Sequence, residues 1–179
     1  INAVNFMDGS DGLLASQTLI VSSSMAYLAH GKMPEPGVTS LVILGGASAG
    51  FIYWNWQPAK IFLGDVGSYF IGFQFAAAIC LSSSKFNLTF VLLIMLTPML
   101  ADSSLTIMRR ALGREEILQA HRTHIYQLLI QQGKSHAQVA LYLGALSVFV
   151  YLPLAMLALS NPGDEIAIFA VGCLAATII

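Results

Sequence analysis

The sequence predicts an all-α fold, a polytopic membrane helix bundle, on the basis of two observations. Of its 179 residues, 56% are hydrophobic and only 9% are charged, and the mean hydropathy is +0.74, well outside the range of soluble domains. The apolar residues also gather in six runs that short polar segments separate. We expect residues 1–179 to form a single integral membrane domain with about six transmembrane helices.

The six apolar runs are the expected membrane spans, and they cover Leu13–Ala29, Val38–Trp54, Tyr69–Leu81, Leu88–Leu100, Ala140–Leu159 and Ile166–Ile179. A bilayer core needs roughly 20 helical residues, so the third, fourth and last runs are short. The serines and Lys85 between the third and fourth favour two helices joined by a tight hairpin, with one broken element as the alternative. Residues 101–139 are expected to be a loop.

The basic residues divide unequally between the two sides of the membrane that this order of spans defines. One side holds six of the eight Lys and Arg residues; it comprises residues 1–12, 55–68 and 101–139. The other side holds only Lys32 and Lys85. By the positive-inside tendency, the first side is predicted to be cytoplasmic. The net charge of −1 points to no class of partner, and no nucleic-acid partner is expected.

Three aspartates on the predicted cytoplasmic side stand in glycine-rich surroundings. In NAVNFMDGSDGLL, Asp8 and Asp11 run directly into an apolar span, and a plain Asp-Gly turn is the simplest interpretation. In FLGDVGSYF, Asp65 lies between two glycines, which allow the backbone to approach phosphate oxygens closely. Because Mg²⁺ takes one or two carboxylates together with phosphate oxygens and water, convergence of these three acids would form a metal site.

The polar stretch DSSLTIMRRALGREEILQAHRTHIYQLL supplies further ionisable groups. Asp102, taken alone, is expected to be the solvated end of a helix. Arg109, Arg110 and Arg114 could bind phosphates or anionic lipid headgroups, or could simply follow the positive-inside tendency, and we favour a structural role for them.

Two histidines of the same stretch, His121 and His124, stand three residues apart and would be neighbours on a helix. This spacing suits metal binding or contact with phosphate. A zinc site is disfavoured, because no set of Cys, His and Glu residues accompanies them in the sequence at the spacing of structural zinc sites.

The motifs NAVNFMDGSDGLL, FLGDVGSYFIG and AHRTHIY, in this order among membrane helices, resemble the polyprenyl-phosphate N-acetylhexosamine-1-phosphate transferases, the MraY/WecA group of glycosyltransferase family 4. The resemblance covers nearly the whole chain. It implies a Mg²⁺-dependent enzyme, with Mn²⁺ as an option, that transfers a sugar 1-phosphate from a UDP-sugar to undecaprenyl phosphate and releases UMP. It also implies a multi-pass protein among the lipids of the bacterial cytoplasmic membrane, with its active site facing the cytoplasm. The oligomeric state is open, and a homodimer is one option.

The resemblance assigns roles to the residues of the first two motifs. Asn2, Asn5, Asp8 and Asp11 match the family element N-x-x-N-x-x-D-G-x-D-G. Asp65 matches the aspartate of the element G-D-x-G-S, where the family's magnesium is bound. Asp8, Asp11 and Asp65 are therefore expected to be catalytic, with Asp65 and Asp8 as metal ligands. Asn2 and Asn5 are expected to bind substrate.

The resemblance also implies a nucleotide site and a phosphate site. The run WNWQPAKIF resembles the family's N-x-x-P-A-x-x-F, so Asn55 and Phe62 are expected to hold the uracil ring, with an interfacial aromatic belt as the alternative. His124 is the best match to the retained catalytic histidine of the family's histidine-rich loop. Together with Arg122 it is expected to contact phosphate, and His121 is expected to help bind substrate.

The chain departs from the family pattern in two places. Tyr126 and Gln127 stand where relatives often have histidine, which places the chain closer to transferases that start O-antigen, or a similar lipopolysaccharide or cell-wall polymer, than to the peptidoglycan enzyme. The family's Asp-Asp pair does not occur in the sequence and is expected upstream of Ile1. The chain would then be the C-terminal part of a ten- or eleven-helix enzyme.

The chemistry and its rivals follow from these assignments. We favour direct attack of the lipid phosphate on the sugar-bearing phosphorus, in which positioning and charge neutralisation do most of the work. Which UDP-sugar is used stays open. A membrane transporter, which would need polar residues at mid-membrane depth, and a non-catalytic membrane remnant are the alternatives.

Overall fold

The computed structural model describes residues 1–82, 86–116 and 122–177, and all regular elements in these ranges are helical. They are α1 (Asn2–Asn5), α2 (Leu13–Ala29), α3 (Glu35–Asn55), α4 (Gly64–Ser82), α5 (Phe86–Leu112), α6 (Ile125–Gln131), α7 (His136–Leu146), the π-helical turn η1 (Ser147–Tyr151), α8 (Leu152–Ser160) and α9 (Glu165–Ala176). The predicted all-α membrane bundle is confirmed.

Each of the six predicted spans coincides with helix over its described residues, and the last span, predicted to reach Ile179, is helical up to Ala176. Within the described residues, four helical stretches are long and apolar enough to cross a membrane: α3, α4, α5 and the continuous run His136–Ser160. Helices α2 and α9 are apolar but shorter. The third and fourth spans are separate helices, as favoured from the sequence, and residues 83–85 between them lie outside the described part.

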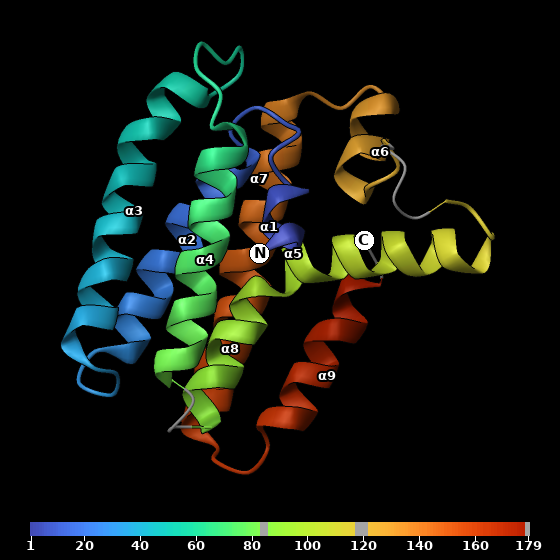
Figure 1. The fold of residues 1–179 in the computed structure, drawn as a ribbon. Helices are drawn as coiled ribbons and strands as arrows, with labels where there is room; N and C mark the ends of the chain where they lie inside the picture. The colour runs from blue at the N-terminus through green and yellow to red at the C-terminus, as the bar shows by residue number, and fades with distance from the viewer. Residues whose placement is uncertain (83–85, 117–121, 178–179) are drawn as a thin grey trace.

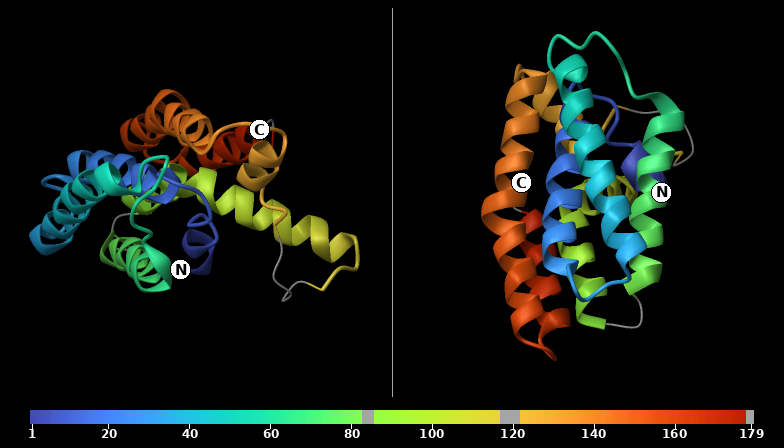
Figure 2. Two further views of the ribbon diagram at one scale, coloured as in Figure 1. Left: turned by 90° about the horizontal axis from the view of Figure 1, so that it is seen from above. Right: turned by 90° about the vertical axis from the view of Figure 1, so that its left-hand side faces the viewer.

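The helices pack side by side as a bundle (Figures 1 and 2). Helix α2 packs along α3, and α5 packs against α8 and α9. Val21, Met25, Leu92 and Met95 from α2 and α5 are completely buried between them. Large apolar side chains such as Phe149 are instead exposed on the outside of the bundle, as expected where helices contact lipid.

Two prolines shape the long helices. Pro98 lies inside α5, and the second half of this helix turns across the bundle and extends to one side (Figure 1). Proline lacks a backbone donor and its ring clashes with the preceding turn, which bends a helix. Pro153 follows η1, so the π-helical turn lies where the regular bonding pattern of the last long stretch is interrupted.

The predicted loop 101–139 is wrong at both ends, because residues 101–112 belong to α5 and α7 begins at His136. Asp102 was expected to be a solvated helix end, yet it and the nearby polar residues Ser103 and Thr106 are each at most 5% exposed. They are buried by other parts of the chain, which a count of apolar residues does not reveal.

The polar connections gather at the two ends of the bundle. Segments 6–12, 56–63 and 132–135 lie at one end, the upper end in Figure 1, and segments 30–34 and 161–164 lie at the other. This is the division that the order of spans predicts. The motif of the first segment, the start of α4 and residues 122–127, called the histidine stretch below, are thereby brought to one end of the molecule.

Candidate functional site

Asp8 and Asp65, the two expected metal ligands, lie close together. Asp65 is the second residue of α4 and is exposed, whereas Asp8 is half-buried in the turn after α1. The Asp8 carboxylate accepts a hydrogen bond from the backbone of Gly64, and it is near enough to Asp65 for the two charges to repel. Burial, reinforced by this repulsion and opposed by the Gly64 bond, raises the pKa of Asp8 to about 6.

Asn5 fastens the short helix α1 to α4. Its Oδ1 accepts a hydrogen bond from the Ser68 hydroxyl, one turn after Asp65. Gly72 allows the close approach, because a Cβ there would lie 3.0 Å from the backbone of Ile1. Asn2 is exposed. The two asparagines thus differ. Asn5 helps to position residues 6–12, called the aspartate turn below, whereas Asn2 is exposed.

Asp11 joins three segments of the chain. Its Oδ2 accepts a hydrogen bond from Ala59 N at 3.1 Å, and its own backbone N–H donates to His136 Nδ1 at 3.0 Å. His136 Nδ1 also lies 3.5 Å from Asp11 Oδ1, but an Nδ1 that accepts the backbone hydrogen carries no proton for an ion pair. We therefore interpret the neutral ring as protonated on Nε2. Gln57 adds a further link, because its Oε1 accepts from Ala137 N at 2.8 Å.

Asn55 is buried and bridges two loops. Its Oδ1 accepts from Gly12 N and its Nδ2 donates to Ile61 O, both at 3.0 Å. The amide is thus used by the chain's own backbone. Phe62, the other residue expected at the uracil ring, is 71% exposed at this end of the molecule.

Replacing Asn55 with alanine is expected to lower the free energy of unfolding by about 1–3 kcal/mol, because the buried Gly12 N–H would lose its acceptor. Thermal unfolding in detergent measures the change. Asn161→Ala is the matched control, since Asn161 is exposed and bonds only within its own helix end. Equal unfolding temperatures for the two variants would contradict the bridging role.

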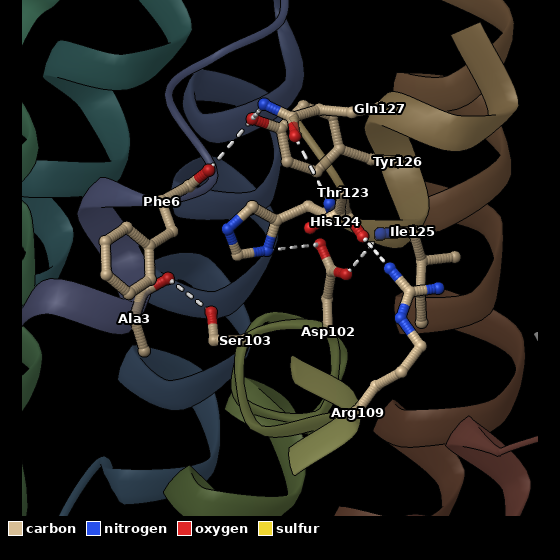
Figure 3. Close-up of polar contacts among 10 residues, drawn as sticks. All are labelled: Ala3, Phe6, Asp102, Ser103, Arg109, Thr123, His124, Ile125, Tyr126 and Gln127. Carbon is tan, nitrogen blue, oxygen red and sulfur yellow. Dashed lines mark hydrogen bonds and ion pairs between the residues drawn. The ribbon is translucent and has the colours of Figure 1, made fainter. Parts of the chain in front are cut away.

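His124 is buried beside the aspartate turn (Figure 3). Its ring centroid lies 5.4 Å from that of Phe6 and 6.0 Å from that of Tyr126, with the latter pair stacked. The Tyr126 hydroxyl donates to Phe6 O at 2.9 Å, and burial raises the pKa of Tyr126 to about 12. Gly9 is required here, because a Cβ would collide with that hydroxyl. The histidine stretch and the aspartate turn therefore form one unit.

A groove of about 440 Å³ opens beside this unit, and it is lined by Gly9, Arg122, Gln127, Ile130, Gln131 and His136. Arg122 is exposed. Sequence reasoning missed His136, which carries only the signal of a helix start in the Ser135 capping box. His121 lies outside the described residues.

The two arginines in the last turn of α5, Arg109 and Arg110, bind the protein itself. Arg109 donates to Thr123 O at 2.7 Å. Arg110 is buried, pairs with Glu115 at 2.9 Å and donates to Glu116 O. These contacts agree with the structural role favoured for both residues. Asp102, expected to be solvated, is instead buried and contacts the histidine stretch, because the turn of α5 carries it beneath that stretch.

Comparison with known proteins identifies the family. Residues 1–83, which contain the Asp8, Asp11 and Asp65 segments, match the family model described as glycosyl transferase family 4. The chain belongs to glycosyl transferase family 4. The chain is 34% identical over 141 residues, or 75% of its length, to "Probable undecaprenyl-phosphate N-acetylglucosaminyl 1-phosphate transferase" of Bacillus subtilis.

Two further relatives carry other names. A "Decaprenyl-phosphate N-acetylglucosaminephosphotransferase" of Mycobacterium tuberculosis H37Rv is 31% identical over 94% of the chain. A "Phospho-N-acetylmuramoyl-pentapeptide-transferase" of Symbiobacterium thermophilum is 33% identical over 84% of the chain. The chain spans 38%, 47% and 45% of the Bacillus, Mycobacterium and Symbiobacterium proteins, which is less than half of each.

The donor set of the candidate site can be compared with what a hard divalent cation requires. Among the described residues, no group of three or more His, Cys, Asp and Glu side chains is placed to hold a metal ion. Mg²⁺ commonly takes only one or two carboxylates and completes its shell with phosphate oxygens and water. The repelling pair Asp8 and Asp65 matches this donor set, since a cation between the two carboxylates would relieve their repulsion.

Proposed function

We propose that the chain provides the active-site part of a polyprenyl-phosphate N-acetylhexosamine-1-phosphate transferase. The proposed enzyme transfers a sugar 1-phosphate from a UDP-sugar to undecaprenyl phosphate, releases UMP, and faces the cytoplasm from the bacterial cytoplasmic membrane. The observation that carries the proposal is the convergence of Asp8, Asp65 and His124 at one end of a membrane helix bundle.

The donor we propose to test first is UDP-N-acetylglucosamine, because the names of the Bacillus and Mycobacterium relatives specify N-acetylglucosamine. The product would start O-antigen or a similar surface polymer. Tyr126 and Gln127, which stand where histidines are frequent in the family, support this placement. The Tyr126 side chain is buried, and the Gln127 side-chain amide donates to the Tyr126 hydroxyl at 3.1 Å.

Each group of residues has a proposed task in this reaction. Asp65 and Asp8 would hold Mg²⁺, or Mn²⁺ in its place, and the bound cation supplies charge neutralisation between two anionic substrates. The exposed Phe62 ring stacks on uracil, and the Asn55 and Asp11 bridges keep its loop in place. Asn2 is exposed near the aspartate turn and contributes to substrate binding directly. Asn5 contributes indirectly, because its bond to Ser68 helps to position that turn.

Phosphate contacts come from the histidine stretch in the proposed mechanism. His124 and Arg122 bind phosphate oxygens, and His121, directly before this stretch in the sequence, contributes as well. An oxygen of the lipid phosphate attacks the sugar-bearing phosphorus directly. The bond from this phosphorus to the bridging oxygen breaks, and its electron pair leaves with UMP.

The decisive experiment measures UMP release by the complete protein, purified in detergent, from UDP-N-acetylglucosamine and undecaprenyl phosphate. We expect release that requires both substrates and a divalent cation. No release with any UDP-N-acetylhexosamine would favour a non-catalytic remnant. Uptake of nucleotide sugar into liposomes without UMP release would favour a transporter. A transporter would need polar residues at mid-membrane depth. The buried polar residues Gln17 of α2 and Ser147 of η1 bond to each other at 2.9 Å and thus serve helix packing.

Metal activation is expected to depend on pH through Asp8. Its carboxyl is protonated below about pH 6, and only the ionised form binds a cation. The metal concentration for half-maximal activity should therefore rise by up to about tenfold per pH unit below about pH 6 and level off above pH ~7. Initial rates against metal concentration from pH ~5 to ~8 measure this. A constant half-maximal concentration would contradict it.

The same raised pKa has an opposite consequence for the metal-free fold. Because the folded state favours protonated Asp8, this stabilisation is present below the ordinary pKa of 3.8 and is lost as the pH rises through about 6. Added Mg²⁺ should restore stability above that pH. Unfolding temperatures at pH ~5 and ~7, with and without metal, provide the control.

A further inference from the structure

Asp102 is a buried acid at an unexpected place. It lies one turn after Pro98, where α5 has turned across the bundle, and only 5% of it is exposed. A buried carboxylate is costly unless polar groups surround it. Its neighbours therefore indicate why the chain keeps a charge at this position.

Both oxygens of Asp102 face the histidine stretch (Figure 3). Oδ1 accepts a hydrogen bond from Ile125 N at 2.6 Å. Oδ2 lies 3.7 Å from His124 Nδ1, at ion-pair distance, and both side chains are less than 10% exposed. One carboxylate thus contacts the ring of His124 and the peptide that follows it, so the ring and its backbone are held together.

A second residue of the same helix holds the other side of the stretch. Arg109 follows Asp102 by seven residues, which is about two helical turns and places both on one face of α5. Its guanidinium donates to Thr123 O at 2.7 Å. The turned half of α5 therefore binds residues 123, 124 and 125 at two points.

Two aromatic neighbours restrict the plane of the His124 ring. Phe6 and Tyr126 flank the ring, and the Tyr126 hydroxyl bonds to Phe6 O. Figure 3 shows the second ring nitrogen on the side away from Asp102. A carboxylate at ion-pair distance from Nδ1 favours a proton on that nitrogen and stabilises the imidazolium form of the ring. In that form Nε2 also carries a hydrogen, which it can donate to a phosphate oxygen.

We propose that Asp102 is a positioning residue for His124, holding the imidazole through Nδ1 and the Ile125 peptide so that the Nε2–H donates to the substrate phosphates. The inference rests on the proposed function, because its first readout is sugar-phosphate transfer. Asp102 does not touch substrate in this arrangement; it acts only through His124.

The first test is a double-mutant cycle in the complete protein, with Asp102→Asn, His124→Ala and their combination. Asparagine keeps an acceptor for Ile125 N–H and removes the charge facing Nδ1. We expect kcat to fall about 10- to 100-fold in Asp102→Asn, with KM changed by less than about threefold. The combined variant should be no slower than His124→Ala, since a positioning residue has no effect once its histidine is absent.

Ser103→Ala is the matched control, because Ser103 is the neighbouring buried residue on α5 and bonds to Ala3 O at 3.2 Å instead. We expect a loss of less than about threefold for it. If Asp102→Asn fails to fold in detergent, Asp102→Glu takes its place in the same cycle, because it keeps the charge but displaces it. Near-parental activity of the folded Asp102 variant, multiplied losses in the combined variant, or an equal loss in Ser103→Ala would overturn the proposal.

The second test does not depend on activity. Nitrogen-15 NMR of histidine-labelled protein, assigned by comparison with His124→Ala, reports which ring nitrogens of His124 carry protons. We expect protons on both nitrogens in the parent and a smaller doubly protonated fraction in Asp102→Asn at the same pH. An unchanged protonation pattern would overturn the proposal, whereas a parent that shows this pattern but transfers no sugar phosphate would overturn only the proposed function.

Discussion

Asp65→Asn in the complete protein is expected to abolish metal-dependent UMP release, with a loss of about 10³-fold or more. The substitution keeps the shape of the side chain and removes the charge that would hold the cation. Because Asp65 is exposed at the start of α4, its replacement should cost the fold little. UMP release across a series of Mg²⁺ concentrations measures the effect.

The control for this variant is Asp164→Asn. Asp164 is also exposed and also lies at the start of a helix, α9, but at the opposite end of the bundle. It should retain parental activity and the parental unfolding temperature. Near-normal release by folded Asp65→Asn would refute the assignment of Asp65 as metal ligand.

His124→Ala is expected to reduce turnover by about 100-fold or more, because a phosphate contact preorganised beside the aspartate turn is lost. Its ring is 3% exposed and lies between Phe6 and Tyr126, so alanine also leaves a cavity. The unfolding temperature should therefore fall as well. Activity must accordingly be compared at a temperature at which both proteins are folded.

Arg109→Ala distinguishes the effect of the backbone support beside His124 from the effect of the His124 ring itself. Arg109 is exposed and its guanidinium donates to the Thr123 carbonyl. Its loss should therefore loosen the stretch and reduce turnover less than His124→Ala does. Transfer rates of the Asp65, His124 and Arg109 variants, measured side by side, test this ranking. Equal rates for all three would contradict the proposed roles.

Much of the architecture could be predicted from local sequence. Long apolar runs must be helical in a membrane, since every backbone polar group needs an internal partner there, and all six runs coincide with helices. The alternation of spans also places the loops correctly at two ends. The continuation of α5 from residue 101 to Leu112 could not be predicted, because buried polar residues such as Ser103 and Thr106 resemble solvated ones in sequence.

The candidate site divides in the same way. Glycine-flanked Asp8 and Asp65 carry a recognisable pattern, and the structure brings them together. His136 carries no such pattern, yet its Nδ1 accepts a hydrogen bond from the backbone N–H of Asp11, 125 residues away. Asn55 was expected at the nucleotide, and the structure adds that its amide bridges Gly12 and Ile61.

Composition and short motifs were enough to predict the membrane class, the order of the helices and the residue types available for phosphate and metal chemistry. Which of those residues meet depends on how the helices pack. Asp102 contacts His124 and Ile125 because α5 turns at Pro98 and passes beneath the histidine stretch. Such a contact joins residues 22 and 23 positions apart through packing, and packing leaves no periodic signal in the chain.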